Sequence, residues 1–570
     1  MISLVVRQIK RITQITLNTL PLQLSYFLAK IFGANMPLSL QLYSLTLEQK
    51  QSIHTKSITS KKNKPKILIA PIFGFAQATL AAESTFARAL TEVGASVDFL
   101  ACGQSLRHCM WDSLGHLSSA NPTISEKIAR KVRCIECTAS INAISKAAVN
   151  KNALVLDRNA ILPVKLIENN LEFISSQEDE HAKSSSLRKL LVGEISDSDR
   201  DRMVYRNFRQ SHEEYKLMLA RIFDNESPDR VIMTHGIYLE HGPLIDICNQ
   251  RSIPVYVYNF QYRKKTICIV KGDTYHRILQ GIEKSVWDHH LANEQKSKLM
   301  GYINSKITGG QDIVNYHPNA QTSEEKIIKE LGLEIDKPVI SFFTNVTWDA
   351  NIYYSSNIYS DMLESIFHAI EYFLTDDSKQ LLIRVHPAES KGGFSTEIKL
   401  GDMIKEKFPD LPKNIKIISS ESDISSYSLA NLSDLNIVYA SNIGTELCSL
   451  GHRVMVVGEA YCRNRGFTID PSSQNHVWDE LSRVERGSKI SAANHELAQK
   501  FAYFWFFRGM IDFDFFDYSI SDNSQAYFSE EIVKLTDSSG KIKDPNLSEI
   551  VSAIVDGRDF DYQKFNIGAN

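Results

Sequence analysis

The sequence lacks several features that would place it in a special class of protein. None of its 570 residues lies in a run of roughly 18 uninterrupted apolar residues, which a membrane-spanning helix requires. The first residues do not read as a secretory signal, because Arg7, Lys10 and Arg11 interrupt the apolar run and no small-residue cleavage site follows it. Cysteine is scarce, and without a secretion signal the eight cysteines indicate reduced thiols or metal ligands rather than a disulfide framework. We therefore expect a cytoplasmic protein.

A strong net charge is also lacking. The chain carries 64 basic and 67 acidic residues, a formal charge of −3, with 43% hydrophobic and 23% charged residues. These proportions are those of a globular protein, and the length predicts two to four domains. Disorder, collagen, a mini-protein framework and a globally basic nucleic-acid binder are excluded.

The charge is distributed unevenly along the chain. Residues 1–66 contain ten lysines or arginines and one acid, a charge of +9 that leaves −12 on the remainder. Residues 1–20 place apolar positions at near-helical spacing with cations between them, which is typical of a basic amphipathic helix at an anionic membrane surface. A helix that packs on the body of the protein would show the same pattern. We interpret residues 1–63 as an amphipathic helical leader and a linker, and expect a peripheral place on the inner face of the cytoplasmic membrane.

The next segment, residues 64–325, has the pattern of a first α/β domain. A short apolar run, a turn containing Gly74, a helical stretch and a second apolar run predict one βαβ unit. Residues 138–229 look helical and charged, as an insertion would. The expected strands are 66–70, 97–100, 230–234, 254–258 and 266–270.

A second α/β domain is predicted over residues 326–495. Its apolar runs alternate with helical patterns, which indicates a parallel sheet buried on both faces. Residues 496–570 form a densely aromatic helix and a tail, which we expect to be buried. The predicted fold is therefore α/β, with two Rossmann-like domains facing a central cleft. The expected strands of the second domain are 339–343, 380–385, 415–418, 435–439 and 454–457.

Two loops after predicted strands of the second domain carry polar groups. Residues 384–389, Arg-Val-His-Pro-Ala-Glu, close one strand, and residues 440–446, Ala-Ser-Asn-Ile-Gly-Thr-Glu, close another and open a helix. The free N–H groups and the dipole of a helix N-terminus favour phosphate. An N-capping serine with a glycine turn would give the same pattern without a ligand, and His386 alone could be a satisfied loop histidine.

Taken in order, these pieces resemble a known family. With residues 344–349, Thr-Asn-Val-Thr-Trp-Asp, and the runs at 450–458 and 461–468, they cover roughly residues 335–470. This half resembles the nucleotide-sugar domain of GT-B glycosyltransferases, and most closely the bacterial capsule polysaccharide biosynthesis family that includes the Kdo transferases. The first half matches more weakly, through residues 234–243.

The resemblance implies a nucleotide-activated sugar donor held mainly by the second domain, with no metal needed for transfer. His386 and the 441–445 turn would hold the donor phosphate or carboxylate, and Glu446 would accept a hydrogen bond from a ribose or sugar hydroxyl. No Asp-x-Asp pair ends a strand in either half, which agrees with metal-independent transfer. The donor-binding candidates are Thr344, Asn345, Asp349, Arg384, His386, Pro387, Glu389, Ser441, Asn442, Gly444, Thr445, Glu446 and Arg463.

On the acceptor side, the candidates for a catalytic base lie in one loop of the first domain. His235, Glu240 and His241 follow a predicted strand, although the two histidines could equally cap that loop. His386 completes the catalytic candidates. Gly74 and Phe75, in the first βα turn, are the next cleft candidates.

Four of the cysteines fall within 36 positions, and the last two form a Cys-x-x-Cys. Two pairs of thiolates could hold a structural zinc ion. Against this, six residues separate the first pair, and its first member reads as the end of a buried strand, where free thiols are common. The candidate zinc ligands are Cys102, Cys109, Cys134 and Cys137.

The resemblance implies a glycosyltransferase of bacterial surface polysaccharide biosynthesis. The donor would be a nucleotide sugar, with a CMP-linked ulosonic acid such as Kdo as the nearest match, and the acceptor a glycan, a lipid-linked glycan or a protein. A teichoic-type polyol-phosphate transferase, a nucleotide-sugar 2-epimerase and a non-enzymatic capsule-assembly scaffold are the alternatives. No nucleic-acid partner is expected.

Overall fold

The computed structural model describes residues 13, 16–21, 23–25, 28, 37–50, 64–71, 73–74, 76–119, 121–156, 176–308, 310–314, 320–354, 356–391, 395–518 and 526–566. Of the predicted amphipathic stretch at residues 1–20, residues 1–12, 14 and 15 lie outside this range, as does most of the linker. No helix within the described ranges has the length and apolar character needed to cross a membrane.

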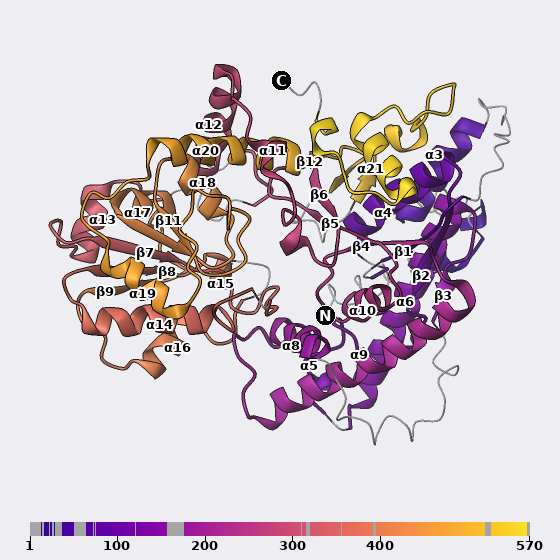
Figure 1. Cartoon of the computed structure of the whole chain (residues 1–570). Helices are drawn as coiled ribbons and strands as arrows, with labels where there is room; N and C mark the ends of the chain where they lie inside the picture. The colour runs from indigo at the N-terminus through magenta and orange to yellow at the C-terminus, as the bar shows by residue number, and fades with distance from the viewer. Residues whose placement is uncertain are drawn as a thin grey trace.

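The first sheet has the strand order of a Rossmann fold (Figure 1). Counting along the chain, its strands lie in the order 3-2-1-4-5-6, with a short seventh strand from the C-terminal region at the edge. The strands are β12 (Ile511–Asp512), β6 (Thr266–Lys271), β5 (Val255–Phe260), β4 (Arg230–Thr234), β1 (Lys66–Ala70), β2 (Ser96–Ala101) and β3 (Leu154–Val155).

Pairing in this sheet is parallel from β3 to β5. β6 runs antiparallel to β5, and β12 antiparallel to β6. Helices that accompany this sheet include α3 (Leu38–Lys50), α4 (Gln77–Glu92), α6 (Ile124–Val149), α8 (Ser176–Leu190), α9 (Asp199–Glu226) and α10 (Gly242–Gln250). The segment 138–229, expected to be a helical insertion, also supplies β3, because Leu100 and Ala101 of β2 pair with Leu154 and Val155.

The second sheet is entirely parallel and repeats the same order, 3-2-1-4-5. Its strands are β9 (Ile415–Ile418), β8 (Gln380–Arg384), β7 (Val339–Phe343), β10 (Leu435–Val438) and β11 (Val454–Val456). The helices along it are α13 (Glu324–Leu331), α14 (Met362–Thr375), α15 (Ala388–Lys391), α16 (Leu400–Lys407), α17 (Ser426–Leu432), α18 (Ile443–Ser449) and α19 (Gln474–Ser482). The predicted fold class, two Rossmann-like α/β domains, is confirmed.

η2 (Tyr275–Arg277) packs on β5 and β6 of the first domain. α11 (Lys284–Trp287) and α12 (Asn293–Thr308) then lead to the second domain, and the aromatic C-terminal region joins the two domains again. α20 (Ala492–Phe504) packs on α18 of the second domain and on α12. It continues into η3 (Trp505–Gly509), and then into β12 in the first sheet.

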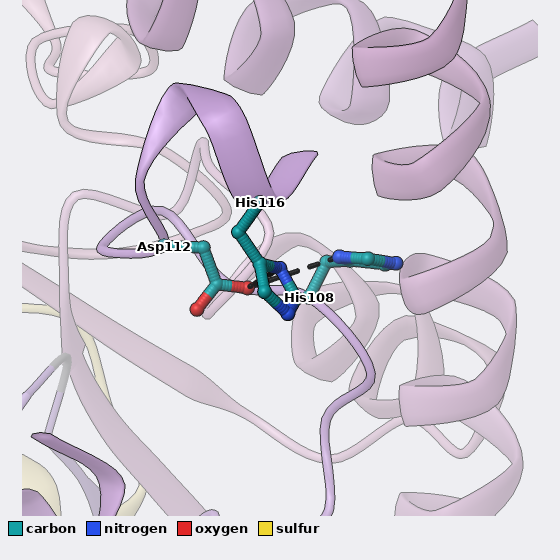
Figure 2. Close-up of side chains that lie close together, drawn as sticks. All are labelled: His108, Asp112 and His116. Carbon is teal, nitrogen blue, oxygen red and sulfur yellow. Dashed lines mark ion pairs between the residues drawn. The ribbon is translucent and has the colours of Figure 1, made fainter. Parts of the chain in front are cut away.

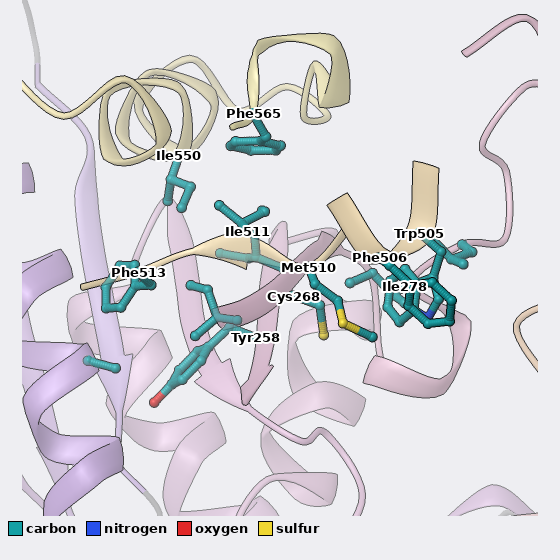
Figure 3. Close-up of a cluster of buried hydrophobic side chains, with 14 of the residues drawn as sticks. Tyr258, Cys268, Ile278, Trp505, Phe506, Met510, Ile511, Phe513, Ile550 and Phe565 are labelled. Atoms are coloured by element: carbon teal, nitrogen blue, oxygen red, sulfur yellow. The ribbon is translucent and has the colours of Figure 1, made fainter. Parts of the chain in front are cut away.

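In Figure 3, Trp505 and Phe506 of η3 lie close to Cys268 of β6 and to Ile278, the residue after η2, in one hydrophobic cluster. Trp505, Phe506 and Met510 are fully buried. The Trp505 indole N–H donates to Asn442 Oδ1 of the second domain at 3.0 Å. This segment therefore belongs to the core that links both domains.

The end of the chain returns to the first domain. α21 (Pro545–Asp556) packs on α4 (Figure 1). Tyr562 donates its hydroxyl proton to the Ile269 carbonyl of β6 at 2.8 Å, and Tyr256 of β5 donates to the Ala553 carbonyl at 3.2 Å. The first domain is therefore completed by residues that lie beyond the second domain in the sequence.

Candidate functional site

A cavity of about 260 Å³ lies between the two domains, at the carboxyl ends of the strands of the second sheet. In an open parallel sheet, ligands bind at the point where the strand order reverses. In the second sheet this point lies between β7 and β10, and the cavity is lined by the loops that follow both strands. From the second domain the lining includes Asn345, Val346, Thr347, Asp349, His386, Tyr439 and Ala440.

The loops after β7, β8 and β10 are tied together by hydrogen bonds. The Asn345 side-chain amide donates to the Ala440 carbonyl at 3.2 Å, which joins the two loops at the reversal point. Thr344 donates its hydroxyl proton to the Arg384 carbonyl at 3.2 Å and accepts the backbone N–H of His386 at 3.0 Å. Thr344 itself is buried, so it positions His386 without lining the cavity.

The tautomer of His386 follows from its contact with the backbone. The Ala388 N–H donates to His386 Nδ1 at 3.1 Å, so Nδ1 must be the acceptor nitrogen of the ring. In a neutral imidazole the proton then lies on Nε2. His386 therefore brings an N–H donor to a ring that lines the cavity.

The first domain contributes Tyr262, Tyr275 and His276 to the same cavity. His276 lies in η2, and its Nδ1 is 3.2 Å from the hydroxyl of Tyr354, which also bonds Thr274 Oγ1 at 2.9 Å. The Arg277 guanidinium stacks over the Tyr354 ring at 4.2 Å. Burial lowers the pKa of His276 to about 4, so its ring is neutral at pH 7.

Asp349 lies at the contact between the domains. Its Oδ1 accepts the hydroxyl of Tyr238 at 3.0 Å and forms an ion pair with Arg188 of α8. Burial opposes its charge, but Arg188 and the nearby His235 hold the pKa of Asp349 below its ordinary value. The carboxylate is therefore ionised at neutral pH, and 46% of its side chain stays exposed.

A second cavity of about 290 Å³ adjoins the first and shares His276, Glu459 and Tyr461 with it. Arg463, a predicted donor-binding residue, lines this second cavity. Its guanidinium donates to Asn357 Oδ1 at 3.0 Å and to the Ser356 carbonyl at 2.9 Å. Arg463 therefore braces the cavity wall.

Several other predicted donor-binding residues are directed into the protein. Arg384 is fully buried and donates to the Ser419 and Ser422 carbonyls at 2.6 and 3.0 Å. Glu389 is buried and accepts the Leu400 N–H at 2.9 Å. Neither these two residues nor Pro387 lines the interdomain cavity.

The 441–446 turn is also built into the core. Glu446 accepts the hydroxyl of Tyr427 at 2.6 Å and pairs with Lys306 of α12 at 3.1 Å. Asn442 donates to the same carboxylate at 3.2 Å. A Cβ at Gly444 would lie 3.0 Å from a Val438 methyl carbon, so packing accounts for this glycine. Of this stretch, only the preceding Ala440 lines the cavity, while Ser441, Asn442, Gly444, Thr445 and Glu446 do not.

The acceptor-side candidates separate in the structure. His235 has a left-handed backbone (φ 64°) and packs beside Tyr238 and Tyr275, with ring centroids 5.4 and 5.0 Å away. Burial lowers its pKa to about 3. Glu240 is buried, accepts the Met110 N–H at 3.1 Å and faces a different cavity, and burial raises its pKa to about 7.

His241 and Gly74 lie away from the interdomain cavity. The Nε2 of His241 lies 3.2 Å from the Ala70 carbonyl at the end of β1. Gly74 packs on α6, where an added Cβ would lie 2.0 Å from the Cys137 carbonyl oxygen. Phe75 lies outside the described residues.

Acid should destabilise the protein partly through His241. Burial lowers the pKa of this histidine to about 4, so the folded state holds it neutral while the unfolded chain protonates near 6.5. The stabilisation is present above pH 6.5 and is lost as the pH falls toward 4. We expect His241→Gln to reduce the drop in unfolding free energy between pH 7 and pH 4 by about 3 kcal/mol, measured by urea unfolding. Gln at the exposed His290 is the control, and an unchanged pH dependence in His241→Gln would contradict the assignment.

The four clustered cysteines line one cavity of about 60 Å³ in the first domain, beside Glu240 and Asp112. Burial raises the pKa of all four thiols, that of Cys137 to about 12. Within the described part of the chain, one group of three His, Cys, Asp or Glu side chains has its ligand atoms within 4.8 Å of one another: His108, Asp112 and His116. The His-x₃-Asp-x₃-His pattern at residues 108–116 is visible in the sequence, but it was not among the predicted metal sites, which were limited to the cysteines.

Sequence reasoning also missed the aromatic part of the site. Tyr275, Tyr439 and Tyr461 line the interdomain cavity. No motif marks Tyr275 or Tyr439, whereas Tyr461 begins the 461–468 run of the resemblance but was given no role in the site.

Comparison with known proteins gives remote structural likenesses. No protein-family model matches the chain, and no curated protein matches its sequence. Two solved structures of Thermosulfurimonas dismutans KpsC are similar to it. The β-Kdo 2,4-transferase is 10% identical, with a TM-score of 0.31, and the match covers 49% of this chain and 79% of that chain. The β-Kdo 2,7-transferase is 16% identical, with a TM-score of 0.30, and the match covers 56% of this chain and 89% of that chain. The chain resembles KpsC-type Kdo transferases.

Other likenesses extend over more of the chain. The UDP-GlcNAc 2-epimerase of Neisseria meningitidis, solved with UDP-GlcNAc, covers 76% of this chain and 97% of its own, at 9% identity and a TM-score of 0.22. All of these similarities concern the fold.

Proposed function

We propose that this chain is a glycosyltransferase that moves a sugar from a nucleotide-activated donor, held mainly by the second domain, to an acceptor that enters from the first. The observation that carries the proposal is the cavity at the reversal point of the second sheet, closed by η2 of the first domain. With the adjoining cavity of about 290 Å³, its volume falls within the roughly 300–1,000 Å³ typical of small-molecule sites.

The donor side is supported by His386 and Asn345. An imidazole N–H that is fixed by the Ala388 backbone can donate to a departing phosphate without being reoriented during the reaction. The rings of Tyr439 and Tyr461 offer apolar faces for the base or the sugar. Stabilisation of the leaving group by such donors needs no metal ion, so we propose metal-independent transfer.

Asp349 is the proposed base. Both contacts given above are made by Oδ1, so among the described residues Oδ2 remains available to an acceptor hydroxyl. The acceptor oxygen would bond to the anomeric carbon as the bond from that carbon to the phosphate oxygen breaks. The hydroxyl proton would pass to Asp349, and the charge left on the phosphate would be met by the N–H of His386.

The identity of the substrates is proposed from the sequence motifs. Their resemblance to the capsule family supports a CMP-linked ulosonic acid as donor and a glycan, lipid-linked glycan or protein as acceptor in bacterial surface polysaccharide biosynthesis. The charge of +9 on residues 1–66 supports a peripheral place on an anionic membrane surface. Equal flotation with anionic liposomes, with and without residues 1–60, would contradict that placement.

Incubation with CMP-, UDP- and GDP-activated sugars tests the function. We expect one donor to be consumed with formation of a glycosidic bond and to raise the melting temperature of the full chain, because a ligand that binds only the folded state stabilises it. Release of CMP with transfer of a phosphodiester would instead indicate a polyol-phosphate transferase, and interconversion without an acceptor would indicate an epimerase. If no donor is consumed and none raises the melting temperature, the proposal is wrong.

A further inference from the structure

Three buried side chains of the metal-ligating type meet in the turn that follows β2. His108, Asp112 and His116 are 8%, 1% and 8% exposed. The Nδ1 atoms of the two histidines lie 3.8 and 3.7 Å from Asp112 Oδ2. Figure 2 shows both imidazole rings on the same side of the carboxylate. One ligand atom from each residue lies within 4.8 Å of the other two.

The backbone of the turn holds these three residues in place. The Asp112 N–H donates to the Cys109 carbonyl at 3.0 Å, which closes the turn. Ser113 caps the short helix α5 (Leu114–Leu117) by accepting the His116 N–H at 3.1 Å. On the other side, the His108 N–H donates to Ser211 of α9 at 3.1 Å. The side chains are therefore oriented before any ligand arrives.

The two oxygens of Asp112 have different surroundings. Oδ1 accepts Arg130 Nε at 2.9 Å, which offsets the buried negative charge. Oδ2 accepts the Cys109 N–H at 3.1 Å and faces the two imidazoles. The Nδ1 of His116 is buried and makes no hydrogen bond with any described residue, although a buried imidazole nitrogen ordinarily has a partner. The turn thus presents a carboxylate oxygen and an imidazole nitrogen that a cation would satisfy.

We propose that His108 Nδ1, Asp112 Oδ2 and His116 Nδ1 bind a Zn²⁺ ion, with water as the fourth ligand. Two imidazoles and one carboxylate are a normal zinc set, with bonds of about 2.0–2.2 Å. In a tetrahedral site, such bonds place the ligand atoms about 3.3–3.6 Å apart. The two separations from Asp112 Oδ2, 3.7 and 3.8 Å, exceed this by only a few tenths of an ångström, and the ligand atoms of the two histidines lie within 4.8 Å of each other. The Arg130 and Cys109 contacts to Asp112 would act as supporting interactions around the ion.

The ion would brace the first domain and take no part in sugar transfer. None of its three ligands lines the interdomain cavity. The turn instead supports α8, because Lys189 donates to the Met110 carbonyl at 2.9 Å. The neighbouring Arg188 pairs with Asp349 at the domain contact. Zinc binding would therefore stiffen the helix that positions this contact.

Metal analysis of the untagged full-length protein, purified without chelator, tests the proposal directly. We expect about one equivalent of zinc in the wild type and less than about a tenth of an equivalent in His116→Ala and in Asp112→Asn, which keeps the shape of the side chain. The matched control is His476→Ala, which should keep the wild-type zinc content: His476 lies 3.7 Å from Glu480, and no third metal-ligating side chain among the described residues joins this pair. Addition of ZnCl₂ to chelator-stripped protein should raise the melting temperature of the wild type and of His476→Ala only.

Three results would overturn the proposal. The wild type could hold less than a tenth of an equivalent of any first-row divalent metal and show no rise in melting temperature with zinc. Both variants could keep the wild-type zinc content, or zinc could be lost in Cys134→Ser/Cys137→Ser and retained in His116→Ala, which would move the site to the cysteines. Because zinc content is measured without substrate, none of these results depends on the proposed transferase activity.

Discussion

Replacement of His386 by alanine is expected to lower kcat/KM for sugar transfer by about 10²–10³-fold, the usual cost of removing one fixed donor to a developing negative charge. The effect should fall mainly on kcat, because the charge on the departing phosphate grows in the transition state. His386 is only partly buried and sits in a loop whose backbone bonds to Thr344 do not involve its ring, so the variant should fold. Steady-state kinetics with the donor found by the nucleotide-sugar panel measures the loss.

Two further variants sharpen this test. His386→Gln carries an amide N–H in place of Nε2–H and should recover part of the activity. His476→Ala, on α19 of the same domain, lies outside the cavity and should keep the wild-type kcat. If His386→Ala keeps the wild-type kcat/KM, the cavity that His386 lines does not hold the donor phosphate. Intact polymer synthesis in cells carrying that variant would favour the scaffold alternative.

Substitution of Lys306 by methionine is expected to lower the free energy of unfolding by about 3–5 kcal/mol. The Lys306 ammonium lies 3.1 Å from Glu446 Oε1 and also pairs with Asp312, and the side chains of Lys306 and Glu446 are 7% and 6% exposed. Methionine fills a similar volume, but it leaves the carboxylates of Asp312 and Glu446 without the cation that neutralises them in the protein interior. Urea unfolding followed by circular dichroism measures the change.

The chain offers a matched control for this substitution. Lys265 also lies between two carboxylates, Asp514 and Asp517 at 2.7 and 2.9 Å, but its side chain is 45% exposed. Lys265→Met should therefore cost at most about 1 kcal/mol. Adding Glu446→Gln to Lys306→Met should restore part of the lost stability. Equal losses at Lys265 and Lys306 would show that burial is not the cause.

Glu446, the partner of Lys306, is also the residue that the resemblance assigns to a hydrogen bond with a ribose or sugar hydroxyl. If this carboxylate mainly stabilises the fold, Glu446→Gln will lower stability and leave the KM for the donor unchanged. Sequence order alone could not separate these roles, because it places Glu446 near a strand end without showing that Lys306 and Tyr427 surround it.

The strands were predictable because parallel strands buried on both faces are short apolar runs. β1, β4, β7 and β9 begin and end at the predicted residues. The two-residue β12 was not predicted, because its pairing with β6 is a long-range contact and its sequence, Ile511-Asp512, has no strand signature.

The candidate site was predicted in part. Asn345, Asp349 and His386 line the cavity because they follow β7 and β8 at the edge where ligands bind. Arg384 belongs to the same motif but ends β8 with its side chain directed to the loop after β9. Which way a side chain points at a strand end depends on the neighbouring loops, and this information lies in the tertiary structure.

The position of β12 has a consequence for how the protein is made on the ribosome. The edge strand β12 begins 240 positions after β6 ends, and α21 follows still later. At about 5–20 residues per second, the ribosome needs about 12–48 s to supply β12 after β6 has been translated. During that interval the nascent first domain presents the open edge of β6, a surface prone to aggregation. Unlike a domain built from consecutive residues, the first domain is complete only after α21, at residues 545–556, has been synthesised, and its folding should therefore depend on chaperones during synthesis.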